Sequence, residues 1–287
     1  MSNALEIRDL TKTYQDFKLD HVSIELPTGY IMGFVGQNGA GKTTTIRCIL
    51  NMASRDSGEV TVFGLDNITH ELALKEDIGA VFDEIFLVDS WRVSQVEKIM
   101  KGFYKGWDSP LFRDFLNEFE LPMDKRVREL SRGMKMKLML SMAMCHGAKL
   151  LLLDEPTSGL DPVARDELLD ILQGYIADGD KSVFFSTHIT SDLERIADYI
   201  TVIERGKIFY TGTKDGLLDH FRIVRGSRDE VSDELKAHFV GLATTGSGFT
   251  AMIRTAEESI VPASMVTEEP TIDEILIHIS KGGVKYE

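Results

Sequence analysis

The sequence predicts an α/β protein in which helices flank a mostly parallel sheet. The apolar run Ile31–Val35 has the length of a buried strand and leads into a glycine-rich loop and a helix-forming run. Lys149–Asp154 and Ser182–Ser186 have the same strand-like composition, and a helix is expected over Val163–Ile176. Strands and helices that alternate in this way build a sheet whose ligand-binding loops lie at the carboxyl ends of its strands. At these ends the chain carries Gly36, Asp154 and His188.

Further elements are expected around this sheet. The segment from Leu5 to Leu26 alternates apolar and polar residues before the turn at Pro27, which predicts short antiparallel strands. Apolar residues at three-to-four spacing predict helices over Val93–Phe119, and Ser131 is a suitable N-cap for the helix after it. The other predicted elements are a strand at Ser57–Gly64, a helix at Leu72–Asp77, a strand at Ile78–Phe82 and a hairpin of Tyr199–Ile203 with Lys207–Tyr210.

The character of the chain changes after Gly212. A predicted helix, Thr213–Phe221, is followed by short β-like runs and a last helix near Ile272–Ser280, with no nucleotide-binding or catalytic motif. We therefore expect a first domain over residues 1–212, with a helical subdomain at about 90–147, and a small α+β accessory domain over 213–287.

Composition restricts the class of partner. The chain has 287 residues and a net charge of −14, which disfavours nucleic acid because the phosphate backbone would be repelled. Its cysteines, Cys48 and Cys145, are isolated, so we read them as core residues of a reducing compartment. The apolar runs, such as Leu150–Leu153, are strand-sized, so we expect no membrane-spanning segment, and work at a membrane would require docking on another protein.

The loop after Val35 predicts phosphate binding. Gly36 to Thr43 fits G-x-x-x-x-G-K-[ST] between a strand and a helix, which is the context that this motif requires. Its glycines allow successive N–H groups to face an anion, and the helix adds its positive end. Lys42 supplies a charge to the β- and γ-phosphates, and the Thr43 hydroxyl supplies a hard oxygen for Mg²⁺.

Other residues suit the same chemistry, although each has an ordinary alternative. Asp154 at the end of an apolar strand can hold Mg²⁺, while Glu155 can polarise a water that attacks the γ-phosphate. Taken alone, these two acids equally fit a strand end that caps a helix. Tyr14 can stack on an adenine ring, but an aromatic residue there is more often a surface packing residue.

Four motifs together resemble the ATP-binding cassette (ABC) family. They are GQNGAGKTT, LSRGM, LLLLDEPTSGLDP and FSTH, and the resemblance extends from Leu5 to about Gly212. It implies a P-loop NTPase core with an antiparallel β subdomain and a helical subdomain. It also implies a head-to-tail dimer with two ATP molecules at the interface. The ATP-contacting residues that it implies are Tyr14, Gly36, Asn38, Gly39, Ala40, Gly41, Lys42, Thr43, Thr44, Ser131, Gly133 and Asp161.

The resemblance also assigns roles. Ser131 and Gly133 match the signature that contacts the γ-phosphate of the other subunit's ATP, and Asp161 matches the D-loop. His188 matches the switch histidine, which with Glu155 would form the catalytic pair. Thr43 and Asp154 would hold Mg²⁺.

The chain departs from the family pattern at two places. The signature has Arg132 and Met134 where the commonest form has Gly and Gln. The strand Ile78–Phe82 runs into Asp83-Glu84, where the family usually has the Q-loop glutamine. We assign Asp83 to that position as a third metal ligand, although an acid there adds repulsion toward phosphate.

The strings FYKGWD and PTIDEILIHIS resemble small bacterial exporters of the ABC-2 type, a branch that includes exporters of antimicrobial or amphipathic peptides. The expected partners are a multi-span membrane permease and a second ATPase subunit, identical or related. The chain itself is expected on the cytoplasmic side of the bacterial membrane, held there by the permease. Trp91 and Trp107 are candidates for the permease contact, with packing inside the helical block as the alternative.

Two other functions remain in view. One is a soluble ABC ATPase that acts on ribosomes or nucleic acid. Against it, translation factors of the family carry two cassettes, and repair relatives carry long coiled coils or zinc-binding cysteines. A small GTPase or nucleotide kinase is disfavoured because no N-K-x-D motif occurs and the signature would be unexplained.

Overall fold

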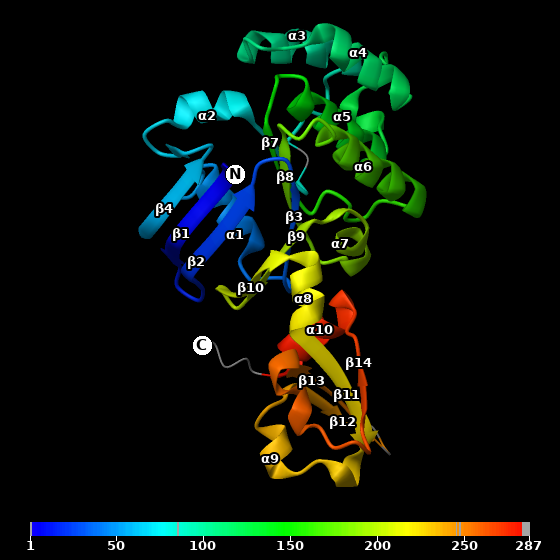
Figure 1. Ribbon diagram of the computed structural model, residues 1–287. Helices are drawn as coiled ribbons and strands as arrows, with labels where there is room; N and C mark the ends of the chain where they lie inside the picture. Colours follow the sequence, from blue (N-terminus) through cyan, green and yellow to red (C-terminus); the bar gives the residue numbers. More distant parts are fainter. Residues whose placement is uncertain (1, 85, 245, 247, 283–287) are drawn as a thin grey trace.

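The computed structural model describes residues 2–84, 86–244, 246 and 248–282 (Figure 1). Its centre is a six-stranded sheet in the order β10-β9-β3-β8-β7-β6, in which all neighbours are parallel except β10 and β9. The predicted mostly parallel sheet is therefore confirmed. Its strands are β3 (Ile31–Val35), β6 (Ile78–Val81), β7 (Leu150–Asp154), β8 (Ser182–Thr187), β9 (Tyr199–Glu204) and β10 (Lys207–Thr213).

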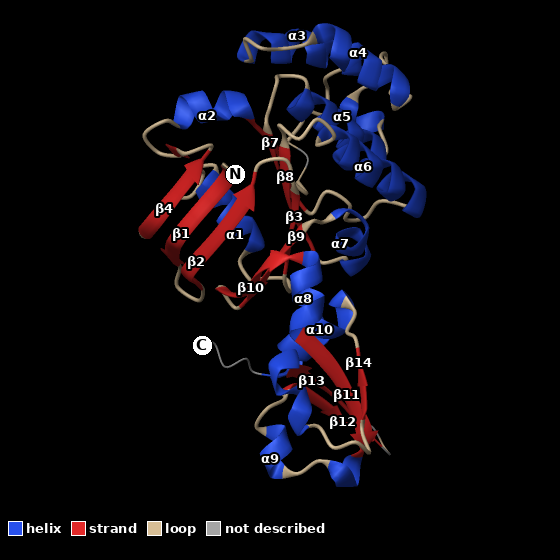
Figure 2. Ribbon diagram, in the orientation of Figure 1, coloured by secondary structure: helices blue, strands red, loops and turns tan. Residues whose placement is uncertain are grey.

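Strands β3, β7 and β8 are buried along their whole length because the sheet is covered on both faces (Figure 2). Side chains of a strand alternate between the two faces. Phe34 and Leu152 accordingly join one core cluster, whereas Val35 and Leu153 join another. This double cover explains why the strands read as continuous apolar runs.

One face of the central sheet packs on α1 (Lys42–Ile49) and on an antiparallel sheet. Ile46 of α1 is completely buried there. The antiparallel strands were expected to be short, but the first two are ten or more residues long. This sheet has the order β2-β1-β4-β5 and consists of β1 (Asn3–Thr13), β2 (Lys18–Pro27), β4 (Ser57–Val62) and β5 (Leu65–Asp66), with α2 (Glu71–Asp77) following it.

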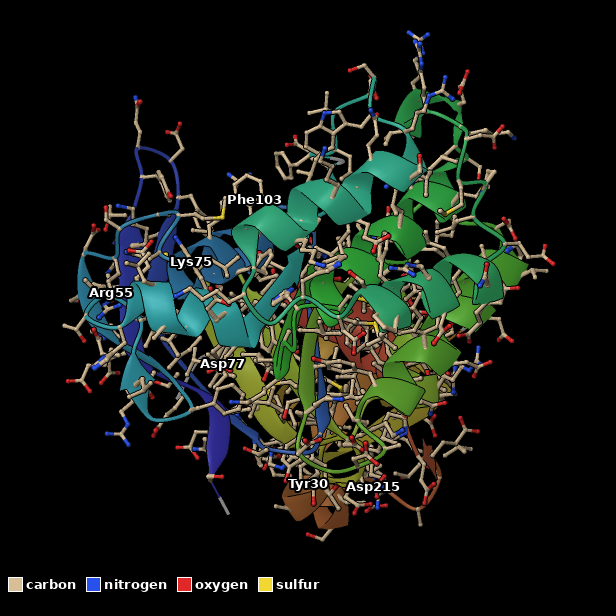
Figure 3. The ribbon with its side chains drawn as sticks, turned by 90° about the horizontal axis from the view of Figure 1, so that it is seen from above. Tyr30, Arg55, Lys75, Asp77, Phe103 and Asp215 are labelled. Atoms are coloured by element: carbon tan, nitrogen blue, oxygen red, sulfur yellow. The ribbon has the colours of Figure 1, made fainter. Side chains whose placement is uncertain are left out.

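The helical block forms a layer above the sheet, and α3 runs across the top of the molecule to end at Phe103 (Figure 3). It has its own apolar cluster, which includes Val96, Phe112 and Leu138. The block is interrupted because Asp108 caps a new helix by accepting a hydrogen bond from the Leu111 N–H at 2.9 Å. The cluster is formed by α3 (Val93–Phe103), α4 (Ser109–Glu118), a 3-10 turn (Val127–Glu129) and α5 (Arg132–Met144). The helices α6 (Pro162–Tyr175) and α7 (Thr190–Ile196) pack with α5 on the face of the central sheet opposite α1.

Trp107 lies inside this layer, so the interpretation of it as a permease-facing residue is wrong. Its side chain is only 8% exposed and packs on Phe112 with ring centroids 5.1 Å apart. The alternative, internal packing of the helical block, is correct for this residue. Trp91 is half-buried against the same cluster.

The C-terminal segment begins with α8 (Lys214–His220) and forms a third sheet. This sheet is antiparallel, has the order β12-β13-β11-β14, and carries α10 (Ile272–Gly282) on one side. The other elements of the segment are β11 (Phe221–Ser227), a 3-10 turn (Arg228–Glu230), α9 (Asp233–Lys236), β12 (Val240–Thr244), β13 (Gly248–Arg254), a 3-10 turn (Thr255–Ile260) and β14 (Val266–Glu268).

This third sheet shares part of its core with the first 212 residues. Ile223, Met252, Ile275 and Ile279 belong to the same buried cluster as Leu193 of α7. A smaller cluster around Phe249 is confined to the C-terminal sheet. The division into two domains at residue 212 stays a prediction, and the shared cluster shows that the two parts pack against each other. Within the described residues, no helix is both long and apolar enough to span a bilayer.

His278 makes the docking of α10 sensitive to acid. Its side chain is 3% exposed, its Nδ1 has no hydrogen-bond partner among the described residues, and burial lowers the pKa of the imidazole below 6.5. Below about pH 6.5, His278 is therefore protonated in the unfolded chain while it stays neutral in the folded chain. The free energy of unfolding consequently falls as pH falls. We expect the melting temperature of the wild-type protein to drop between pH 7.5 and 5.5 more than that of His278→Gln.

The control for this comparison is His70→Gln, because His70 is exposed. It should retain the wild-type pH dependence. Equal slopes for all three proteins, measured by calorimetry, would remove His278 from the acid response.

Candidate nucleotide-binding site

The loop Gly36–Thr43 joins β3 to α1 and has a shape that only glycine permits at two positions. A Cβ on Gly36 would lie 2.2 Å from the Ile203 carbonyl oxygen. Gly41, the N-cap of α1, has φ of +119° and packs against Leu19. The backbone can therefore turn sharply and leave the first N–H groups of α1 free for an anion.

Lys42 is held across this loop by oxygen atoms. Its Nζ donates to the Gly36 carbonyl at 2.8 Å and lies 3.3 Å from Glu155 Oε1, with 6% of the side chain exposed. A buried ammonium needs anionic or carbonyl partners. A bound phosphate would supply the same kind of partner at this position.

Asp154 is fixed by two hydroxyl groups. Thr43 Oγ1 donates to one carboxylate oxygen at 2.7 Å, and Ser186 Oγ donates to the other at 2.6 Å. Asp154 and Ser186 face each other in the β7–β8 register, and Ser186 is completely buried. The sequence reasoning did not assign Ser186 a role, although it lies in the FSTH motif.

Glu155 adopts a left-handed backbone conformation, with φ of +52°, which is uncommon for a residue other than glycine. Its N–H donates to Ser186 Oγ at 3.0 Å. Its carboxylate contacts Lys42 on one side and His188 on the other, where Nδ1 and Oε2 are 2.7 Å apart. The unusual turn thus places one carboxylate between two basic side chains.

A hollow of about 460 Å³ lies over the loop and is large enough for a nucleotide phosphate tail. It brings together most of the predicted loop residues with Glu155. Its lining consists of Asp16, Phe17, Asn38, Gly39, Gly41, Lys42, Thr43, Thr44 and Glu155. Ala40, also predicted as a contact, is 5% exposed. Gly36 and His188 line a second, smaller cavity, which the loop shares with α10.

Phe17 is the aromatic residue that lines this hollow. Tyr14, the predicted adenine-stacking residue, does not line it and is 46% exposed with Lys12 Nζ 5.4 Å from its ring centroid. Its role stays a prediction. The sequence could have suggested Phe17 as an alternative aromatic contact, because it lies three residues after Tyr14 in the same turn before β2.

Ser131, Gly133 and Asp161 lie outside this hollow. Ser131 Oγ accepts from the Met134 N–H at 3.2 Å and so caps α5, as predicted. Asp161 caps α6 by accepting from the Val163 and Ala164 N–H groups at 3.0 Å each. The three residues therefore belong to two neighbouring helix N-termini rather than to the phosphate loop of their own chain.

Asp83 is ion-paired with Arg132. The structure does not bring it into contact with Thr43 or Asp154, whose hydroxyl–carboxylate pair lies at the phosphate loop. Among the described residues, no three His, Cys, Asp or Glu side chains are grouped closely enough to hold a metal ion. A divalent ion would thus need oxygen atoms from a ligand or from water besides those of this chain.

Comparison with known proteins agrees with this geometry. The profile of the family described as "ABC transporter" matches residues 19–158. The bacitracin transport ATP-binding protein BcrA of Bacillus licheniformis is 32% identical over 214 residues, covering 72% of this chain and 69% of the relative. The lantibiotic transport ATP-binding protein SrtF of Streptococcus pyogenes is 33% identical over 218 residues, covering 74% and 92%. A solved ATP-binding subunit of an ABC transporter superposes with a TM-score of 0.68 at 26% identity, covering 75% and 91%.

Ser186 offers a test of the site. Because its hydroxyl orients Asp154 and also accepts the Glu155 N–H, Ser186→Ala should raise the Mg²⁺ concentration needed for half-maximal ATP hydrolysis by about tenfold. Ser182→Ala is the matched control, since this buried hydroxyl of the same strand accepts the Gly29 N–H at 2.9 Å. A similar shift in both variants would point to general weakening of β8.

Proposed function

The chain belongs to the ABC transporter family and is an ATPase of that family, and from this premise we propose that it drives a bacterial exporter of peptides or other small amphipathic compounds. The observation that carries the hydrolytic part of the proposal is the contact set of Glu155, whose carboxylate lies between Lys42 and His188 beside the phosphate loop. The export part rests on relatives named for transport of bacitracin and of a lantibiotic.

The phosphate loop would hold the triphosphate. The free N–H groups at the start of α1 and the positive end of that helix attract the anionic tail. Lys42 would exchange its contact with Glu155 for the β- and γ-phosphates. The hollow beside Phe17 leaves room for the rest of the nucleotide.

The donor set fits Mg²⁺. Thr43 and Asp154 place a hydroxyl and a carboxylate 2.7 Å apart, and Mg²⁺ prefers such hard oxygen ligands together with phosphate oxygens and water. These two residues would hold the ion, which would neutralise phosphate charge when bound. Ser186 would keep the Asp154 carboxylate in position.

Glu155 and His188 would carry the hydrolytic step. Glu155 accepts a proton from water as the water oxygen bonds to the γ-phosphorus, and the bond to the bridging oxygen of ADP breaks. Release of Lys42 to the phosphates frees the Glu155 carboxylate for this proton. His188 would orient the water and hold a γ-phosphate oxygen.

A second copy of this chain, or a related ATPase, would complete each site. Ser131 and Gly133 lie outside the hollow of their own chain, at the N-terminal turn of α5. That turn can receive a phosphate presented by another subunit. Binding of ATP would close the two subunits together, and hydrolysis would let them open.

A membrane permease would receive this motion. Two relatives are named for transport of bacitracin and of a lantibiotic, which supports export of peptides. Phe86, in the loop between β6 and α3, and Phe103, at the end of α3, are 65% and 74% exposed, far more than Trp107. We therefore propose these two aromatic residues for the permease contact. The site would then lie at the cytoplasmic face of the membrane.

Glu155→Gln tests the catalytic role. The amide keeps the size of the side chain but cannot accept the proton, so ATP binding should persist while the turnover rate falls at least about 100-fold. Size-exclusion chromatography should show an ATP-bound dimer. Glu118→Gln, an exposed change on α4, should hydrolyse ATP like the wild-type protein. Normal turnover in Glu155→Gln would exclude this residue as the base.

Purification from membranes tests the partner. The tagged chain, solubilised in mild detergent, should bring down a protein with several membrane spans, and Phe103→Ser should weaken this association without lowering ATP affinity. Recovery of ribosomes instead, identified by their RNA, would favour the soluble ABC ATPase function.

A further inference from the structure

Arg132 and Asp83, one residue from each of the two places at which this chain departs from the family pattern, contact each other. Arg132, the first residue of α5, donates through Nη2 to Asp83, which follows β6. The two residues are 49 positions apart in sequence. The commonest family form has residues without charge at both positions, whereas here an acid and a base form an ion pair.

Arg132 also contacts the turn between β7 and α6. Its Nε donates to the Ser158 carbonyl oxygen at 2.8 Å. A Cβ on Gly159, where φ is +68°, would lie 3.0 Å from the same Nε, so the arginine side chain packs directly on this glycine. One side chain of the helical layer therefore joins two loops of the central sheet.

The contacts of Arg132 fix the position of α5 more than they stabilise the fold. The side chains of Arg132 and Asp83 are 41% and 47% exposed, and exposed ion pairs contribute little to stability. A cation in the first turn also opposes the helix dipole of α5, and the Asp83 carboxylate offsets that cost. Arginine suits the position because its planar fork can donate in two fixed directions at once.

We propose that Asp83 and Arg132 form a positioning pair that sets the N-terminal turn of α5 relative to the turn that follows Glu155. This inference rests on the proposed function, in which Ser131 acts in the site of the other subunit and Glu155 acts in its own. The pair thus couples the two sites of a dimer through one chain. Asp83 is then a positioning residue and not a metal ligand.

The test uses the full-length chain and the variants Asp83→Asn, Arg132→Gln and their combination. Each single change should lower kcat about five- to tenfold through a misplaced α5, with the KM for ATP and the half-saturating Mg²⁺ concentration within about twofold of wild type. The double variant should be no slower than either single variant, because both changes break the same contact. Asp83→Glu, which retains the carboxylate, should recover most of the lost rate.

The matched control is Glu84→Gln, which removes one negative charge from the exposed neighbouring residue. It should leave kcat unchanged. A raised Mg²⁺ requirement in Asp83→Asn alone would instead make Asp83 a metal ligand. Independent, multiplicative losses in the double variant, or wild-type rates in all variants, would equally overturn the positioning pair.

Hydrogen exchange separates this inference from the proposed function. Without nucleotide, Asp83→Asn should speed amide exchange at residues 132–136, whereas Glu84→Gln should not. If the wild-type chain does not hydrolyse ATP, the proposed function fails. The positioning pair is then tested by hydrogen exchange alone, and it is overturned if Asp83→Asn exchanges at residues 132–136 as slowly as the wild-type protein. If the wild-type chain is active and Asp83→Asn matches it, only the pair fails.

Discussion

The buried Ser186 hydroxyl is the contact on which the arrangement of the site depends. It donates to Asp154 and accepts the Glu155 N–H, so it fixes two consecutive acidic residues with different surroundings. This contact exists because β7 and β8 pair with Asp154 opposite Ser186. A shift of one residue in this register would turn the acids to the other face of the sheet. The register is therefore a requirement of the chemistry as well as of the core.

The layers around the sheet place the loops at the carboxyl ends of the strands. Packing on both faces holds β3, β7 and β8 rigidly, and Thr43 ties the first turn of α1 to Asp154. The helical layer brings the N-terminal turn of α5 close to the same end, where Arg132 reaches the turn after β7. The rigid sheet positions the acids, while the helical layer carries residues that would act on another subunit.

The C-terminal sheet is joined to this arrangement by a shared core and a cavity. Ile275 and Ile279 of α10 pack in the same cluster as Leu193 of α7. A cavity of about 200 Å³ lies between α10 and the phosphate loop, with Gln37 and His188 in its lining. The phosphate loop and α10 thus line opposite sides of one cavity.

The elements and chemistry that depend on local order could be predicted from the sequence. The phosphate loop, the acids after the apolar strand Leu150–Asp154 and the N-cap Ser131 are recognisable because one short segment contains both the residues and their structural context. Nearly all long helices and strands follow from apolar spacing for the same reason. Short elements such as α7, α9 and β14 were not predicted, because a few residues show too little apolar periodicity.

Contacts between residues that are distant in the sequence depend on the packed fold and could not be predicted. Ser186 with Asp154, Arg132 with Asp83, and Phe17 with Gly41 are pairs separated by 24 or more residues, and their contacts arise from strand register and helix packing. Trp107 is a further example, because its position in the sequence did not predict whether its side chain would face a partner or the interior. A sequence specifies which groups can bind or titrate, whereas the packed fold decides which of them share a site.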